Sequence, residues 1–144
     1  MANYMRFIVT DGELSMAEIE QALAAMDDGY RLQLHGDQRH HSADLHHGDR
    51  LLGEIEINNP GDELFEDEMD ELLAMVDTAE EGEALALVTA TLGDAKGMVA
   101  FNSLATEEVS LDTLWRWLHQ NREGLLQTDG VGYFDVGGLL LRVE

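Results

Sequence analysis

Cysteine is absent from this sequence of 144 residues, which excludes disulfides, thiolate zinc sites, iron–sulfur ligation and cysteine nucleophiles. Long apolar runs are absent too, because none approaches the roughly 18–20 residues that span a bilayer. The first residues hold no basic segment followed by a long apolar core, so they do not resemble a signal peptide. We therefore expect a cytoplasmic protein that does not enter a membrane.

Positive charge is scarce. Eight Lys and Arg residues stand against 30 Asp and Glu, which gives a formal net charge of −22, and Lys96 is the single lysine. This excludes direct binding to nucleic acid, which demands clustered positive charge. Because 44% of the residues are hydrophobic, the chain can bury a core, and the charge does not indicate disorder. The acidity fits a salt-adapted cytosol, a high-GC genome or a surface for a basic partner, and composition leaves all three open.

Linkers, repeats and catalytic motifs are also missing. Pro60 is the single proline, and no Pro- or Ser-rich segment divides the chain, which predicts one domain over residues 1–144. The sequence has neither a G-x-x-x-x-G-K-[ST] phosphate loop nor a G-x-S-x-G nucleophile elbow. These absences favour a non-enzymatic protein without settling the matter.

Hydrophobic periodicity predicts three helices. Ser15 and Glu18 have the spacing of a capping box, and an apolar stripe follows at helical spacing. The second helix is predicted to open at Asn59 and Pro60, since proline is favoured at the first helical position. The third is predicted to run from Ser110 to Gly124, because glycine commonly follows the last helical residue.

The remaining segments predict strands. Residues 4–10 alternate, with Met5, Phe7 and Val9 on one face and Tyr4, Arg6 and Ile8 on the other. The other predicted strands are residues 30–35 and 51–57, which would form a hairpin with a long loop, then 84–92, 98–102 and short C-terminal strands. The order to residue 92 is β-α-β-β-α-β, as in the ferredoxin-like split βαβ arrangement, and a C-terminal β-α-β-β segment extends it. We predict an α+β fold with a mostly antiparallel sheet and helices packed on one face.

Negative charge is concentrated in one part of the chain. Between Arg50 and Lys96 there is no basic residue, and there are fourteen acids. Six of them follow 3–4 spacing on the second helix and form one stripe opposite its apolar side chains: Glu63, Glu66, Asp67, Asp70, Glu71 and Asp77. Such a stripe is either a solvated face or a surface for a basic partner. Like charges at this spacing repel each other and destabilise the helix. Because the chain keeps this repulsion, we take these six as candidate partner-binding residues.

Histidines are concentrated between residues 35 and 47. If residues 36–50 fold back on themselves, two pairs would face each other: His40 with His41, and His46 with His47. Imidazole is a suitable ligand for zinc or nickel, so these four are the candidate metal ligands. The alternative is a solvated loop, because the pattern matches no established ligand spacing and neighbours in a strand point to opposite faces.

An outward tryptophan is the third candidate feature. Trp115 belongs to the predicted core stripe, whereas Trp117 is turned about 200° away on a helix. It lies near Arg116, His119 and Arg122, and Trp and Arg are enriched in interfaces. Trp117 is therefore a candidate partner-binding residue, and the basic group would complement the acidic helix of a second copy in a homo-oligomer. The alternative is a Trp117 covered by the C-terminal strands.

The sequence thus leaves two functional hypotheses from different classes. The first is a non-enzymatic interaction domain, of the inhibitor, immunity or adaptor kind, whose anionic helix binds a basic protein. The second is a metal-binding module or metal-dependent enzyme that uses the His-rich loop. We rank the first hypothesis ahead of the second.

Overall fold

The computed structural model describes residues 4–34, 42–104 and 111–143. The described strands are β1 (Tyr4–Val9), β2 (Tyr30–Leu34), β3 (Ser42–His47), β4 (Arg50–Asn58), β5 (Gly97–Ser103), β6 (Gly124–Thr128), β7 (Gly132–Asp135) and β8 (Gly138–Arg142). The described helices are α1 (Met16–Met26), α2 (Glu63–Val76), α3 (Glu83–Gly93) and α4 (Asp112–Asn121). None of these helices has the length and apolar character needed to cross a membrane.

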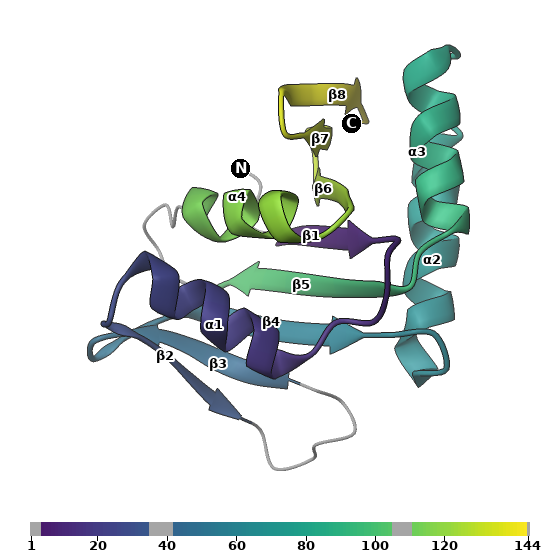
Figure 1. The fold of residues 1–144 in the computed structure, drawn as a ribbon. Helices are drawn as coiled ribbons and strands as arrows, with labels where there is room; N and C mark the ends of the chain where they lie inside the picture. Colours follow the sequence, from purple (N-terminus) through teal and green to yellow (C-terminus); the bar gives the residue numbers. More distant parts are fainter. Residues whose placement is uncertain (1–3, 35–41, 105–110, 144) are drawn as a thin grey trace.

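The strands form one eight-stranded sheet in the order β2-β3-β4-β5-β1-β6-β7-β8, and every neighbouring pair is antiparallel. β1 lies inside the sheet between β5 and β6 (Figure 1). Its side chains alternate as the sequence predicts, with Phe7 and Val9 in one apolar cluster and Ile8 in another. The prediction of an α+β fold with an antiparallel sheet is therefore confirmed.

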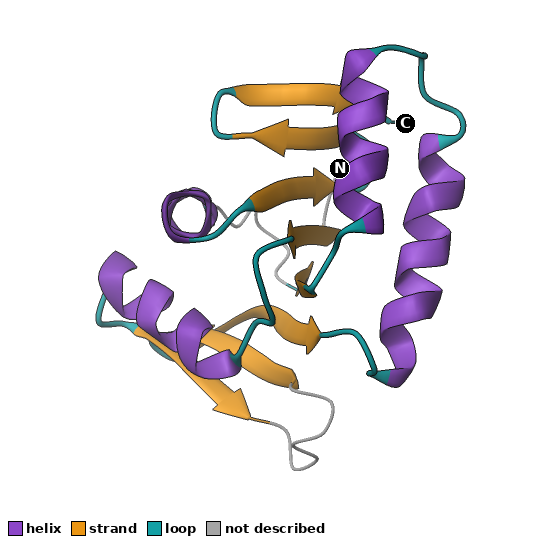
Figure 2. Cartoon of the chain, turned by 45° about the vertical axis from the view of Figure 1, so that its right-hand side comes forward, coloured by secondary structure: helices purple, strands orange, loops and turns teal. Residues whose placement is uncertain are grey.

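Helices cover both faces of the sheet, so the prediction that they pack on one face is wrong. α1 and α4 lie on one side, whereas α2 and α3 lie side by side on the other (Figures 1 and 2). The first pair packs against Phe7, Val9 and other buried side chains of the inner strands. The second pair buries Leu72 and Val88 against Ile8 and its neighbours on the opposite face. The physical reason is that β1 carries apolar side chains on both faces, and each face needs a cover.

The segment 84–92 is helical, as part of α3, and the prediction of a buried strand there is wrong. Leu85, Val88 and Leu92 are spaced three and four apart and point toward the sheet, as a helix requires. Alanines between them hide this period by making the segment apolar on every side, although alanine is the best helix former. With α3 helical and β3 inserted after β2, the chain does not follow the ferredoxin-like order.

The chain between β2 and β4 contributes a strand of its own. β3 pairs with β2 on one side and with β4 on the other, so those two strands are not partners in a hairpin. Its apolar residues, Ala43 and Leu45, are buried and alternate with polar ones. The surrounding histidines conceal that alternation in the sequence.

Two polar contacts fix the start of α1. The Ser15 hydroxyl accepts a hydrogen bond of 3.3 Å from the Glu18 backbone N–H, which confirms Ser15 as the N-cap. The Glu18 carboxylate, the other half of the predicted capping box, instead accepts from Arg122. Nearby, the Asn59 side chain bonds both backbone groups of Leu14 at 3.0 Å. Because Asn59 follows β4 and is buried, this pair ties α1 to the end of a central strand.

Candidate functional site

α2 places its predicted acidic residues on its outer surface. Glu66, Asp67, Asp70, Glu71 and Asp77 are all exposed, while Phe65, Met69, Leu72 and Val76 on the other side of the helix are buried. The side chain of Glu63 lies outside the described part of the structure. The helical period therefore brings five of the six candidates together along one exposed stripe, which we call the α2 acidic face.

Within residues 4–34, 42–104 and 111–143, no basic side chain pairs with the α2 acidic face. Within the described residues, none of its five carboxylates takes part in a hydrogen bond or an ion pair. The adjacent acid Glu68 differs, because it points inward and pairs with Arg6 at 2.9 Å. Leu64, which is 43% exposed, lies one turn before Asp67 and adds an apolar side chain to the same surface.

Arg6 is the centre of a polar cluster that the sequence did not predict. Its side chain is 5% exposed, and its guanidinium pairs with Glu68 of α2 and with Asp129 after β6, each at 2.9 Å. It also donates a 2.7 Å hydrogen bond to the side-chain amide oxygen of Gln127, and its guanidinium carbon lies 4.3 Å from the centroid of the Tyr4 ring. The Nε and Nη1 groups of Arg6 thus donate to one residue of α2 and to two residues at the end of β6, so this cluster anchors α2 to the sheet.

Two tyrosines near Arg6 titrate far above the usual range. Burial raises the pKa of Tyr4 to about 12, and the nearby Glu68 adds to the shift. Burial likewise raises the pKa of Tyr133 to about 12, and its hydroxyl is buried without a hydrogen-bond partner among the described residues. In both cases Arg6 opposes the shift, because a cation favours the phenolate.

These shifts predict alkaline unfolding. Because the folded-state pKa of Tyr4 and Tyr133 exceeds the ordinary tyrosine value of 10.0, the unfolded chain loses phenolic protons first as the pH rises. The stabilisation is complete below pH 10 and is lost as the pH rises through about 12. We expect a phenolate absorbance titration in which both tyrosines ionise together with the loss of the far-ultraviolet circular dichroism. Ionisation of both near pH 10 in a chain that stays folded would contradict the burial described here.

The structure separates the two described histidines of the predicted metal site. His47 stacks on Tyr30 with centroids 4.7 Å apart and lies 3.5 Å from the Asp27 carboxylate. His46 follows the strand alternation to the other face of the sheet. His40 and His41 lie outside the described residues. No group of three metal-ligating side chains occurs within residues 4–34, 42–104 and 111–143, and the zinc or nickel site stays a prediction.

Two of the three residues in the predicted basic group on α4 contact other residues of the same chain. Arg122 donates to both carboxylate oxygens of Glu18 at 2.7 and 2.8 Å and pairs with Asp11 at 2.9 Å. His119 packs edge-on against Phe7, and burial lowers its pKa, which favours the neutral ring. Arg116 is thus the exposed cation of the three. A homo-oligomer that uses this group stays a prediction.

Trp117 does not project freely into solvent. It is half-buried and packs against the apolar cluster beneath α1 and α4. Its neighbour Trp115 is buried, as the core stripe requires. An indole that is partly covered keeps one edge available for contact, although most of its apolar surface already stabilises the fold.

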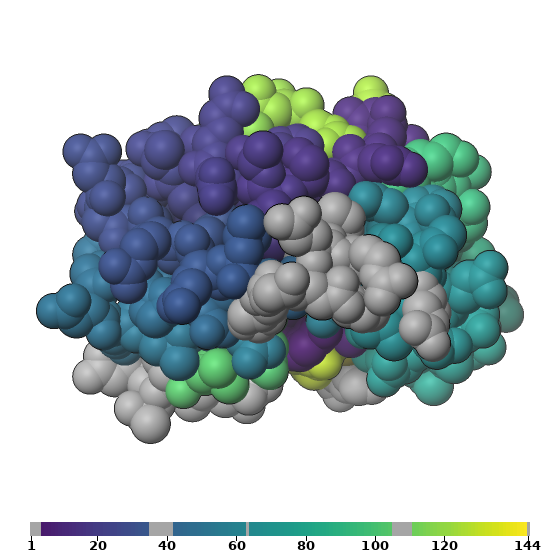
Figure 3. Space-filling model, turned by 90° about the horizontal axis from the view of Figure 1, so that it is seen from below, coloured from purple at the N-terminus to yellow at the C-terminus, as the bar shows by residue number. Residues whose placement is uncertain are grey.

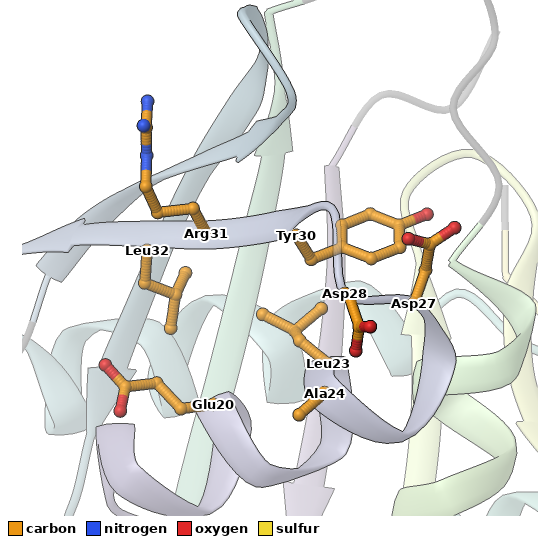
Figure 4. A pocket seen from close by; sticks show the side chains of 8 residues that line it. All are labelled: Glu20, Leu23, Ala24, Asp27, Asp28, Tyr30, Arg31 and Leu32. Carbon is orange, nitrogen blue, oxygen red and sulfur yellow. The ribbon is translucent and has the colours of Figure 1, made fainter.

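A groove lies between α1 and the edge strand β2 (Figure 4). Its volume is about 330 Å³, at the small end of the range for ligand sites. Leu23 and Ala24 of α1 face Leu32 of β2 across it. Three acids line the same groove: Glu20, Asp27 and Asp28.

No protein-family model, curated protein or solved structure matches this chain. Its function therefore has to follow from the geometry and charge of its own surfaces. Two of these, the Arg6 cluster and the β2 groove, were not predicted. Arg6 did give a signal, because a lone arginine within an apolar strand must find buried partners. The groove gave none, because it depends on how α1 packs beside β2.

Proposed function

We propose that this chain is a non-enzymatic protein-interaction domain, of the inhibitor, immunity or adaptor kind, whose α2 acidic face binds a basic surface on another protein. The observation that carries this proposal is the set of five exposed carboxylates without a hydrogen bond or ion pair to any described residue. Unpaired charges on a rigid helix attract an oppositely charged surface over a distance of about 8 Å at physiological ionic strength.

The dimensions of α2 support the proposal. The helix has 14 residues and is therefore about 21 Å long, comparable to one side of a standard protein interface. Exposed Leu64 at its beginning supplies an apolar contact of the sort found at interface centres. Charge of a single sign along this length favours fast, salt-sensitive association.

The arrangement also carries an energetic cost. Glu66 and Asp70, and Asp67 and Glu71, are like-charge pairs four residues apart. Each pair destabilises a helix by about 0.2–0.5 kcal/mol. A basic partner would offset this repulsion, which is why binding accounts for the stripe better than solvation alone.

We predict that neutralising the α2 acidic face abolishes salt-sensitive binding of a basic partner. The variant carries Glu66→Gln, Asp67→Asn, Asp70→Asn, Glu71→Gln and Asp77→Asn, and its net charge is −22 + 5 = −17. We expect at least tenfold less basic protein to be retained from a lysate of the source organism at low salt. The variant should be slightly more stable than the original chain, because like-charge repulsion is removed, so misfolding would not explain the loss.

A control variant with the same net charge distinguishes the effect of where the neutralised acids lie from the effect of total charge. It neutralises five exposed acids elsewhere: Glu13, Asp49, Glu54, Asp112 and Glu123. This control should retain the partner and release it when salt screens the attraction. Equal loss in both variants, or no recovery of a basic protein by the original chain, would overturn the proposal.

A further inference from the structure

The groove beside β2 combines apolar walls with acidic groups. Leu32 points from β2 toward α1, while the guanidinium of Arg31 points away from α1, on the other side of the strand (Figure 4). Glu20 and Asp28 have no hydrogen bond or ion pair with another described residue through their side chains. A long side chain with an aliphatic stem and a cationic end, lysine or arginine, matches both parts of this groove.

Among the described strands, β2 has a partner on one edge only. It is the last strand at its end of the sheet, and no described strand pairs with its outer edge. Its final residue, Leu34, is 53% exposed. An extended peptide that adds to such an edge gains backbone hydrogen bonds, while pockets beside the strand select its alternate side chains.

We propose that the outer edge of β2 binds an extended basic peptide as a ninth strand, with a lysine or arginine side chain in the groove against α1. Residues two apart in that peptide point to the same face, so cationic residues at alternate positions would lie on the α1 side. The residues between them would lie on the side of Arg31, which disfavours a cation there. The site therefore selects an alternating pattern over a block of basic residues.

The charge state of the groove suits this ligand. The backbone N–H of Gly29 donates to Asp27 at 2.7 Å, and this bond, followed by His47, holds the pKa of that carboxyl below its usual range. Asp27 thus stays ionised at neutral pH. The net charge of −22 further raises the concentration of cationic peptides near the surface.

A second copy of this chain is a poorer occupant of the same edge. Pairing β2 with β2 of another copy would bring two sets of Glu20, Asp27 and Asp28 together, on chains that each carry a net charge of −22. The site is also separate from the α2 acidic face. In a view of the β2–β3 side, the blue surface of those strands lies at the left and the teal surface of α2 at the right (Figure 3).

The test uses two blocked synthetic peptides of strand length, in which lysines either alternate with threonines or form one block. Binding to the full chain is measured by fluorescence anisotropy at low salt. We expect the alternating peptide to bind at least fivefold more tightly than the block peptide. We also expect slower amide exchange in β2 when it is bound. Equal affinities, or no change in β2, would overturn the proposal.

Backbone pairing is tested by methylating alternate amide nitrogens of the alternating peptide. One set of amides faces β2 and the other faces solvent, so one methylated peptide should lose binding and the complementary one should keep it. If both peptides bind equally, simple ion pairing explains the affinity and strand addition is wrong.

Two variants of equal charge locate the site. Glu20→Gln with Asp28→Asn should weaken the binding of the alternating peptide at least fivefold. Glu123→Gln with Asp112→Asn, two exposed acids outside both the groove and the α2 acidic face, should leave the affinity for this peptide unchanged, although both chains carry −22 + 2 = −20. The opposite result would contradict the assignment. So would the finding that the chain forms a dimer and that the peptide dissociates this dimer. Because the groove and the α2 acidic face are tested with different variants, failure here does not affect the proposed function, and failure of that proposal does not affect this one.

Discussion

Replacing Arg6 with methionine should lower the free energy of unfolding by about 2–4 kcal/mol, a large part of the 5–15 kcal/mol typical of a domain. Methionine preserves most of the side-chain length but removes the charge that pairs with Glu68 and Asp129. The two carboxylates would then repel each other, and no cation would offset their charges. The expected loss lies below that of a fully buried pair, because Glu68 is 21% and Asp129 is 40% exposed and water can reach them.

Urea unfolding is the appropriate measurement for this variant, because guanidinium is itself a salt and would screen the charges. Arg116→Met is the matched control: Arg116 is exposed and takes part in no hydrogen bond or ion pair within the described residues, so its loss should cost less than about 0.5 kcal/mol. Adding Glu68→Gln and Asp129→Asn to Arg6→Met should restore part of the loss. Equal midpoints for the Arg6 and Arg116 variants would show that the cluster does not anchor α2.

Replacing Gly124 with alanine should cost roughly 3 kcal/mol, because the new methyl group overlaps packed backbone. Gly124 begins β6 and lies against β1, where an added Cβ would clash with the carbonyl group of Ile8. Backbone in the middle of a sheet cannot move aside as a flexible side chain can. We expect a lower urea midpoint and a weaker pairing of β6 with β1, which amide exchange would report.

Gly93→Ala is the control for that variant and should change stability in the opposite direction. Gly93 is the last residue of α3, and an added Cβ would meet no atom within 4 Å. Alanine favours the helical conformation over glycine by about 0.5–1 kcal/mol, so this variant should be slightly more stable than the original chain. Two glycine-to-alanine changes that destabilised the protein equally would contradict the packing at β6.

Gly124 also illustrates the limit of sequence-based reasoning. A glycine after an apolar helical stripe predicts the end of that helix, and α4 does end close by, at Asn121. What requires glycine at position 124, however, is its contact with β1, more than a hundred residues earlier in the chain. Local patterns predict a cap or a period well, but they hold no information about which distant backbone will lie against a residue.

The same distinction explains which elements were predicted. An apolar stripe on one side predicts each of α1, α2 and α4, although α2 begins at Glu63 and not at Asn59 and Pro60. The alternation of β1 follows from its own residues. The segment 84–92 predicts a strand and not α3, because Ala84, Ala86 and Ala90 hide its helical period. The place of α2 and α3 on the second face could not be predicted, since it depends on β1 being central in the sheet.

For the candidate sites, the sequence predicts which charged side chains are exposed, but it does not predict which of them form ion pairs within the chain. The five described acids of the α2 acidic face are exposed, as their spacing opposite Phe65 and Met69 indicates. The basic group on α4 was not predictable, because Arg122 finds Glu18 and Asp11 only when α4 packs beside α1. A charged side chain in a sequence gives its sign, whereas the fold decides whether a partner in the same chain neutralises it.

The most direct test of the α2 acidic face is zero-length carbodiimide cross-linking of the complex captured at low salt, followed by mass spectrometry. This reagent joins carboxylates to amines, and the chain has one lysine of its own, Lys96, so nearly all products report the partner's lysines. The account predicts cross-links concentrated between Glu66 and Asp77. Cross-links spread evenly over the acids of the chain, or concentrated away from α2, would contradict it.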